Sequence, residues 1–287
     1  MIGTIVTALV IDINADNIFV QKEGRTMAVS KEDLKKADVK TINLGDTITG
    51  FVYEDRFGQM RLTPNLPNII NEQYEFVEVV KVRKDLGVFV DVGLEDKDIV
   101  VSMDDLPSEK HLWPKVGNKL CLTLYTDHKE RMWGKLADHL IMQSKLVKAP
   151  ADLFNKNVEA ICFEVKLVGT RVLTTEGYLG FLHPNERIEE PTLGELISAR
   201  VIDVKSDGTI NISTKPRAHE AIGEDAEMIL EMLRRMPGNQ LPYHDKSDPE
   251  EIKSYFGISK GQFKRAIGHL LKARLIKKID NGIELIK

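Results

Sequence analysis

Residues 44–52 of the chain read LGDTITGFV, and the same pattern returns as VGNKLCLTL at residues 116–124 and as LGELISARV at residues 193–201. In each stretch an apolar residue and a glycine precede an alternating strand. The three glycines lie 72 and 77 residues apart, and a turn with a second short strand follows each stretch. This spacing predicts a hairpin that occurs once in each of three repeats.

Each hairpin is preceded by the same succession of shorter segments. An alternating or apolar strand comes first, and a strand that ends in a short turn follows it. The earlier strands are residues 17–20, 86–92 and 171–174, and the turns are residues 29–34, 101–106 and 182–186. About five short strands per repeat, with a brief helical turn before the fourth, predict a closed Greek-key barrel of the OB-fold type.

The repeats resemble the S1 domain, an RNA-binding barrel. The residues that carry the resemblance are LGVFVDVG at 86–93 and GFLHPNE at 180–186. S1-type barrels bind single-stranded RNA by stacking bases on aromatic side chains, while a histidine, a carboxylate and basic groups hold the strand. By resemblance, the candidate RNA-binding residues are Phe19 and Asp55 in the first barrel, Phe89 in the second, and Arg171 and His183 in the third.

The repeats depart from the S1 pattern at several positions. Ser30 and Ser102 stand where the family has histidine, Leu86 replaces the first aromatic residue of the second barrel, and Arg171 replaces an aromatic residue. These departures imply weak binding by each barrel. Phe19 and Phe89 could instead be core residues, and His183 could be a turn residue before a proline. Trp113 and Trp133 are interpreted as packing residues at the edge of the second barrel.

After Lys215 the apolar residues change from a period of 2 to a period of 3.6, which predicts helices. The first predicted helix carries Ile229 and Leu233 on one face. The second is predicted to begin after the N-cap Asp248 and to end at Gly257, and Ser259 is the predicted N-cap of the third. Residues 275–286 then form a predicted hairpin around an Asn-Gly turn. Three helices and a hairpin resemble a winged helix.

Basic residues accumulate in this last module. From Lys260 to the end of the chain there are eight Lys and Arg residues against two acidic ones. We expect the third helix to approach a duplex groove and the hairpin to contact phosphates. The candidate contacts are Lys260, Lys264 and Arg265 on the helix and Lys277 and Lys278 on the hairpin. A basic helix face can also be merely solvated, or can bind RNA or protein.

The composition excludes several other classes of protein. The chain has 287 residues, 42% of them hydrophobic, and a net charge of −4, which is typical of a globular chain and argues against a uniformly basic nucleic-acid binder. Its two cysteines, Cys121 and Cys162, lack disulfide or zinc spacing, and no signal or membrane-spanning stretch is seen. We therefore expect a cytoplasmic protein, with a monomer favoured. No metal, cofactor or catalytic motif is indicated, so we expect no enzyme.

Three S1-type barrels followed by a winged helix resemble the conserved virulence factor B family of bacterial regulatory proteins. The expected domains are residues 1–66, 67–146, 147–218 and 219–287. The resemblance implies a non-catalytic protein that binds single-stranded RNA and regulates gene expression, including virulence factors, after transcription. Two alternatives stay open: a scaffold that docks on ribosome, polymerase or nuclease, and a transcription factor that binds duplex DNA through the winged helix.

Overall fold

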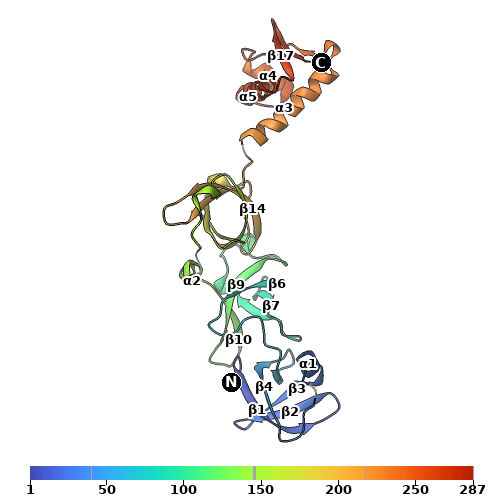
Figure 1. Cartoon of the computed structure of the whole chain (residues 1–287), viewed down its shortest axis with the longest axis vertical. Coiled ribbons are helices and arrows are strands. Elements are labelled where there is room, and N and C mark those ends of the chain that lie inside the picture. Colours follow the sequence, from blue (N-terminus) through green and yellow to red (C-terminus); the bar gives the residue numbers. More distant parts are fainter. Residues whose placement is uncertain (40, 145–146, 217, 287) are drawn as a thin grey trace. The chain divides into compact units, whose positions relative to one another are not determined.

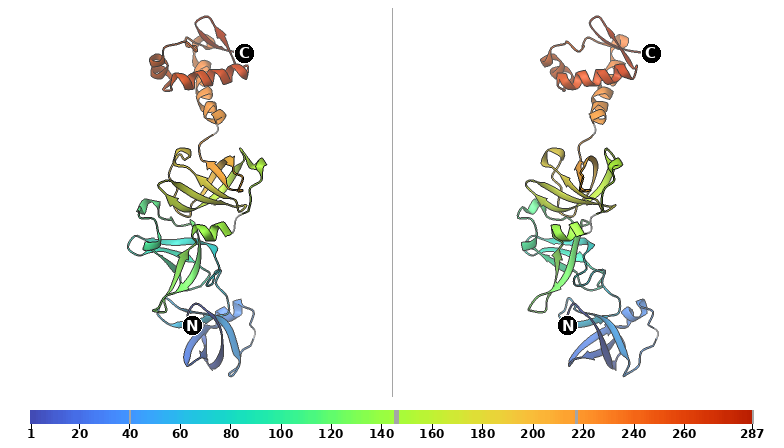
Figure 2. Two further views of the ribbon diagram at one scale, coloured as in Figure 1. Left: turned by 90° about the vertical axis from the view of Figure 1, so that its left-hand side faces the viewer. Right: turned by 60° about the vertical axis from the view of Figure 1, so that its left-hand side comes forward.

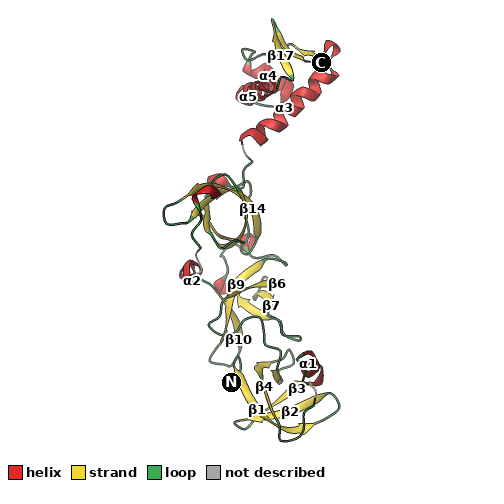
Figure 3. Ribbon diagram, in the orientation of Figure 1, coloured by secondary structure: helices red, strands yellow, loops and turns green. Residues whose placement is uncertain are grey.

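The computed structural model describes residues 1–39, 41–144, 147–216 and 218–286. The chain forms two compact units, Met1–Lys215 and Pro216–Lys287. Strands dominate the first unit, whereas three helices and a small sheet make up the second (Figure 3). The predicted fold class, three five-stranded barrels followed by a winged helix, is confirmed. The domain limits predicted at residues 66, 146 and 218 stay a prediction.

The first barrel closes in the order β1-β2-β3-β5-β4, with β3 and β5 parallel (Figure 1). A short helix connects β3 to β4, where the sequence predicted a helical turn. The elements are β1 (Ile5–Ile13), β2 (Asn17–Lys22), β3 (Arg25–Ser30), α1 (Lys31–Lys36), β4 (Thr47–Glu54) and β5 (Met60–Thr63).

The second and third barrels repeat this topology, and their closed sheets can be followed in Figure 2. The second contains β6 (Glu75–Arg83), β7 (Gly87–Asp91), β8 (Ile99–Ser102), two short 3-10 turns (Met103–Asp105 and Lys110–Leu112), β9 (Lys119–Thr126) and β10 (Met132–Leu136). The helix α2 (His139–Ser144) and a 3-10 turn (Ala151–Leu153) follow it in the chain. The third contains β11 (Asn157–Lys166), β12 (Gly169–Thr174), β13 (Leu179–Leu182), a 3-10 turn (Pro184–Glu186), β14 (Leu196–Val204) and β15 (Ile210–Ser213).

The first strand of every barrel carries a bulge at the same place. The register with the second strand shifts between Val10 and Asp12 in the first barrel and between Val79 and Lys81 in the second. In the third barrel it shifts after Cys162. A bulge bends its strand and re-aims the side chains beside it. The three barrels therefore have equivalent side-chain positions beside the bulge, although different residues occupy them.

The first two barrels pack against each other. Their buried side chains form one hydrophobic cluster, which begins at Ile2 and also takes in Leu193 of the third barrel. The third barrel has a core of its own, and a small cluster joins its Leu173 and Leu179 to Cys121 of the second barrel. Ion pairs join the first two barrels at Lys36–Glu95, with 2.9 Å between nitrogen and oxygen, and at Arg25–Glu130, with 2.8 Å. Shared apolar burial is the main stabilising term, because exposed ion pairs contribute little.

The second unit is a winged helix. It consists of α3 (Ala218–Arg235), a 3-10 turn (Pro237–Asn239), β16 (Gln240–Leu241), α4 (Pro249–Phe256), α5 (Lys260–Lys272), β17 (Ile276–Ile279) and β18 (Gly282–Leu285), with the sheet order β16-β18-β17. The predicted caps are confirmed. Asp248 accepts the N–H groups of Glu250 and Glu251, Gly257 is left-handed with φ of 70°, and Ser259 forms a capping box with Gln262.

The turn of the hairpin lies one residue earlier than the sequence predicted. Its two loop residues are Asp280 and Asn281, and Gly282 already pairs with Ile279 as the first residue of β18. A Cβ atom at Gly282 would lie 2.0 Å from the carbonyl oxygen of Leu241. The glycine is required by this close approach of β16 rather than by the turn.

Candidate nucleic-acid interface

One row of outward side chains runs around each barrel from the bulge. Phe19 pairs with Asp12, Phe89 with Lys81, and Arg171 with Glu164, in each case directly after the register shift. Three of the five residues predicted from the S1 resemblance thus occupy one structural position. All three are half-buried rather than part of the barrel cores, so the alternative reading of Phe19 and Phe89 as core residues is wrong.

The second barrel presents an aromatic row. The ammonium group of Lys81 lies 5.6 Å from the centroid of the Phe89 ring, and the guanidinium carbon of Arg131 lies 5.2 Å from the centroid of the Trp133 ring. Across β9 and β10, Trp133 pairs with Tyr125, and both are half-buried. Cations over half-exposed rings form a surface on which bases can stack.

The two tryptophans of the second barrel differ in role. Trp113 is 5% exposed and donates its indole N–H to the carbonyl of Pro107, as expected of a packing residue. Trp133 instead belongs to the outer row, where its indole N–H donates to Asp127 over 3.1 Å. The interpretation of Trp133 as a packing residue missed this placement. The sequence did contain a signal for this placement: Lys135 lies two residues after Trp133 on an alternating strand, so both side chains lie on the same face, and a lysine indicates the solvent side.

In the third barrel, Arg171 lies among partners that the sequence reasoning missed. It donates to Glu164 over 2.7 Å and pairs across the sheet with Phe181. Although burial opposes ionisation of Glu164, its partners Lys166 and Arg171 hold its pKa below the usual value. Phe163, Arg171 and Phe181 line a groove of about 420 Å³, the third-barrel groove. Phe181 lies within the S1-like stretch GFLHPNE at residues 180–186, directly before Leu182 and His183, so the sequence did contain a signal for this aromatic residue.

His183 caps the short turn after β13. Its Nδ1 accepts the N–H of Asn185 over 3.1 Å, so the turn role considered for it is confirmed. A neutral imidazole that accepts at Nδ1 carries its proton on Nε2. The ring is exposed and lies edge-on to Phe181 with 6.4 Å between centroids. The imidazole can therefore cap the turn and still offer a donor to a ligand.

The serines that replace this histidine cap the same turn in the other barrels. Ser30 accepts the N–H of Glu32 over 3.1 Å, and Ser102 accepts that of Asp104 over 3.3 Å. Histidine and serine share a side-chain acceptor that reaches the second following N–H. The substitution keeps the cap and removes the ring.

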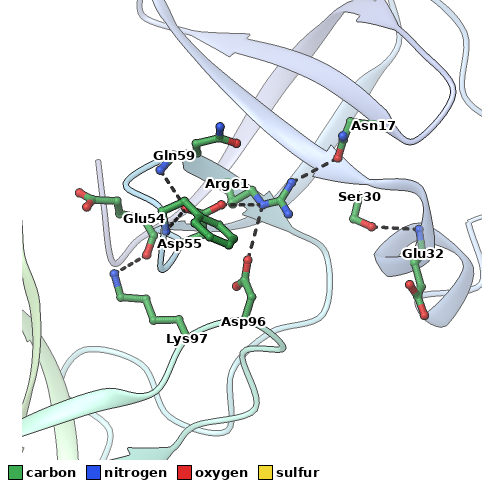
Figure 4. Close-up of polar contacts among 10 residues, drawn as sticks. Asn17, Ser30, Glu32, Glu54, Asp55, Gln59, Arg61, Asp96 and Lys97 are labelled. Carbon is green, nitrogen blue, oxygen red and sulfur yellow. Dashed lines mark hydrogen bonds and ion pairs between the residues drawn. The ribbon is translucent and has the colours of Figure 1, made fainter.

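Asp55 in the first barrel lies inside a polar network (Figure 4). Its side chain is 4% exposed, accepts the N–H groups of Phe57 and Gln59, and lies 3.4 Å from the Nε atom of Arg61. From the second barrel, Asp96 lies 3.7 Å from the same Nε atom, and Lys97 donates to the carbonyl of Glu54. These contacts occupy the predicted carboxylate and join it to the second barrel.

The winged helix separates its basic residues into two kinds. Lys264 and Arg265 are exposed on α5, and Lys260 is half-buried at its start. Within residues 223–286, none of the three takes part in an ion pair. On the hairpin, Lys277 lies 2.9 Å from Glu284 and Lys278 lies 3.5 Å from Asp245. Helix α5 therefore carries the more available positive charge.

Other kinds of site find little support. In the described ranges, no group of three His, Cys, Asp or Glu side chains could hold a metal ion. Cys121 and Cys162 are buried, and burial raises the pKa of the Cys162 thiol, which disfavours a thiolate nucleophile. None of the helices described has both the length and the apolar composition needed to cross a bilayer.

Comparison with known proteins agrees with this architecture. An S1 domain model matches residues 2–65, a model of the CvfB first S1-like domain matches residues 74–135, and one of the second domain of the virulence regulatory factor CvfB matches residues 142–216. A CvfB-like winged helix model matches residues 227–285. The chain is thus a multidomain protein built from nucleic-acid-binding types of domain.

Whole-chain relatives specify the family. Conserved virulence factor B of Staphylococcus epidermidis is 37% identical over 92% of this chain and 87% of its own length, and that of Staphylococcus aureus is 36% identical over the same shares. The chain belongs to the conserved virulence factor B family. A crystal structure of a multidomain protein with nucleic acid binding domains from Streptococcus pneumoniae is 45% identical, with a TM-score of 0.70 over 99% of this chain and 98% of that one.

Proposed function

We propose that the chain binds single-stranded RNA along the outer faces of its second and third barrels. The observation that carries the proposal is the common position of Phe89 and Arg171 beside the bulge, each next to further aromatic or basic side chains. Stacking on an aromatic ring contributes about 1–3 kcal/mol per base without demanding a sequence, and arginine planes stack as well. His183 adds a donor at the end of the third row.

The first barrel has a smaller part in this proposal. Phe19 offers one half-exposed ring on its outer face. The rest of that row is engaged in packing, because Tyr53 is 3% exposed and Arg61 is held by Asp55 and Asp96. We leave Asp55 out of the RNA interface and assign the first barrel mainly to supporting the second.

The winged helix adds a second nucleic-acid contact in this proposal. Lys260, Lys264 and Arg265 on α5 would meet phosphates or a groove, with Lys277 and Lys278 as weaker contacts because each already has an acidic partner. Separate weak contacts on one chain raise each other's effective concentration. Modest binding by each barrel is therefore compatible with useful affinity of the whole protein.

The regulatory part of the proposal rests on family membership. We infer a non-catalytic, cytoplasmic protein, favoured as a monomer, that influences gene expression after transcription, including that of virulence factors. A protein that recognises unpaired RNA with little sequence preference would act by competing for single-stranded regions of transcripts.

The test is a fluorescence-anisotropy titration of labelled single-stranded RNA and matched duplex DNA at two salt concentrations. We expect micromolar or tighter binding of RNA by the full chain and weaker, partly retained binding by the unit of residues 1–215. Loss of RNA binding in that unit with strong duplex binding by the full chain would favour a DNA-binding transcription factor. Binding of neither nucleic acid would favour the protein-interaction scaffold.

A further inference from the structure

A second groove lies between the second and third barrels and adjoins the third-barrel groove. This junction groove has a volume of about 380 Å³ and receives Asp105 and Lys135 from the second barrel and Phe163 and Glu164 from the third. His139, the first residue of α2, lines it too. The two grooves share His139 and Phe163, so they form one continuous depression that reaches Arg171.

The junction groove also continues the aromatic row of the second barrel. Lys135 follows Trp133 by two residues on β10, so their side chains lie on the same face of the sheet. Burial raises the pKa of the Tyr125 phenol, and the nearby negative charge of Asp105 raises it further, so Asp105 lies close to Tyr125. The aromatic row, the junction groove and the third-barrel groove therefore follow one another on the unit of residues 1–215.

The lining of the junction groove suits a base better than a phosphate. Glu164 is already paired with Lys166 and Arg171, and Asp105 and Asp138 outnumber the single ammonium group of Lys135, so the local charge disfavours a phosphate. The ring of Phe163 and several aliphatic side chains supply apolar walls: Leu106, Pro107, Leu136, Val165 and Leu193. An uncharged aromatic base can stack on such a wall while its edge meets polar groups.

One polar atom in this lining lacks a partner. The Nδ1 atom of His139 is buried and makes no hydrogen bond within the described residues. Buried polar atoms in folded proteins nearly always have a partner, and an unpaired one costs about 1–3 kcal/mol. Because His139 lines both grooves, a rotation of its ring would turn this atom toward a ligand edge and satisfy it.

We propose that the junction groove binds one nucleobase of an RNA strand that crosses from the second barrel to the third, stacked on Phe163 and hydrogen-bonded to His139. The proposal rests on the RNA-binding function proposed above and adds the crossing point between the two barrels. It makes the two barrels one binding surface, because the base at the crossing fixes the path of the strand. Removing the crossing contact lowers the affinity for strands long enough to span both barrels.

The test uses the full-length protein and a labelled oligouridylate of about 16 nucleotides, long enough for more than one barrel. We expect Phe163→Leu to weaken binding about 5- to 150-fold, the range for one stacked base, and His139→Ala, which removes a hydrogen bond, to weaken it about 2- to 12-fold. Leu140→Ala is the matched control, because Leu140 is the next residue of α2, is 71% exposed and lines neither groove. It should bind as the unmodified protein does.

Two further readouts separate this proposal from the function on which it rests. RNA should quench the fluorescence of Trp133 in the unmodified protein and in both groove variants at saturation, and Trp133→Phe should remove that signal. If the unmodified protein showed no RNA binding and no quenching, the proposed function itself would be refuted. Quenching with unchanged affinity in both groove variants, at melting temperatures equal to that of Leu140→Ala, would overturn the crossing site alone. The slope of log affinity against log salt concentration should be the same in His139→Ala as in the unmodified protein. A slope smaller by about one in this variant would mean that the groove binds a phosphate instead of a base, and would also overturn the crossing site.

Discussion

The ammonium group of Lys81 lies 5.6 Å from the centroid of the Phe89 ring, on the outer face of the second barrel. The two residues face each other across β6 and β7, directly after the bulge. A cation near an aromatic ring is attracted by the quadrupole of the ring. The pair thus places a flat stacking surface beside a positive charge, which are the two features that a nucleotide needs for its base and its phosphate.

Replacing Phe89 by alanine should weaken binding of single-stranded RNA by about 1–3 kcal/mol, or roughly 5- to 150-fold, because one stacking surface is lost. Since the ring is outside the core, the free energy of unfolding should fall by less than the 3–5 kcal/mol typical of a buried phenylalanine. Anisotropy and thermal unfolding measure the two effects separately. A large drop in melting temperature with unchanged affinity would contradict the assignment.

Ile99→Ala is the matched control for that variant. Ile99 pairs with Val90, next to Phe89, and its side chain is fully buried. Its truncation should cost about 2–5 kcal/mol of stability through the cavity that it leaves. The folded protein should nevertheless bind RNA with unchanged affinity, because no exposed surface changes.

In the proposed RNA-binding mode, Glu164 would compete with RNA for Arg171. Its carboxylate holds the guanidinium group over 2.7 Å. Glu164→Gln should therefore raise RNA affinity severalfold by freeing the guanidinium for a phosphate or a base, whereas Arg171→Ala should lower it. Anisotropy titrations at fixed salt measure both changes. Weaker binding by the glutamine variant would mean that the pair acts as a unit or that Arg171 is structural.

The two roles of His183 can be separated with the residue that other barrels use. His183→Ser keeps an acceptor for the N–H of Asn185, as Ser30 and Ser102 do in their turns, and should leave the melting temperature nearly unchanged. It removes the ring and its Nε2 donor, so RNA affinity should fall. His183→Ala should lose the cap as well, which costs about 0.5–2 kcal/mol of stability. Equal RNA affinity in all three proteins would restrict His183 to its turn.

The fold could be predicted from the sequence because it depends on local patterns that recur three times. The apolar-glycine hairpins and the period-2 strands determine which residues face each core, and they agree with the observed register. The caps at Asp248 and Ser259 are equally local. The hairpin turn was predicted one residue too late because Gly282 is required by the close approach of the β16 backbone. A short stretch of sequence does not show such a long-range contact.

The candidate site was predicted only in part. Of the residues that the resemblance singled out, Phe19, Phe89 and Arg171 occupy one equivalent outward position in each barrel, and their role in binding stays a prediction. The resemblance did not find Phe163 or His139, because these come from different barrels and meet only through the packing of β11 and α2. It also could not show that Asp55 is enclosed by the turn of its own hairpin and by Arg61.

Acid should weaken the support of Trp133 through Asp127. The backbone N–H of Arg131 is the largest of several hydrogen bonds that, against burial, hold the pKa of this carboxyl far below its usual value of 3.8. A pKa that is lower in the folded state stabilises the fold above the unfolded value and ceases to do so as pH falls toward the folded value. Denaturant unfolding between about pH 4 and pH 2 should therefore show a shallower loss of stability in Asp127→Asn than in the unmodified protein. Parallel pH profiles would contradict this role.

Helix α5 and the hairpin of the winged helix should differ in their effect on the salt dependence of binding. The double variant Lys264→Ala/Arg265→Ala removes two exposed cations that have no ion-pair partner in the described part of the chain, and should reduce the slope of log affinity against log salt by about 2. In Lys277→Ala/Lys278→Ala the reduction should be smaller, because these ammonium groups already neutralise Glu284 and Asp245. Titrations of RNA and of duplex DNA at four salt concentrations measure both slopes. If the α5 variant left both slopes unchanged, the basic face of α5 would be a solvated surface, and a change on duplex DNA alone would favour the DNA-binding alternative.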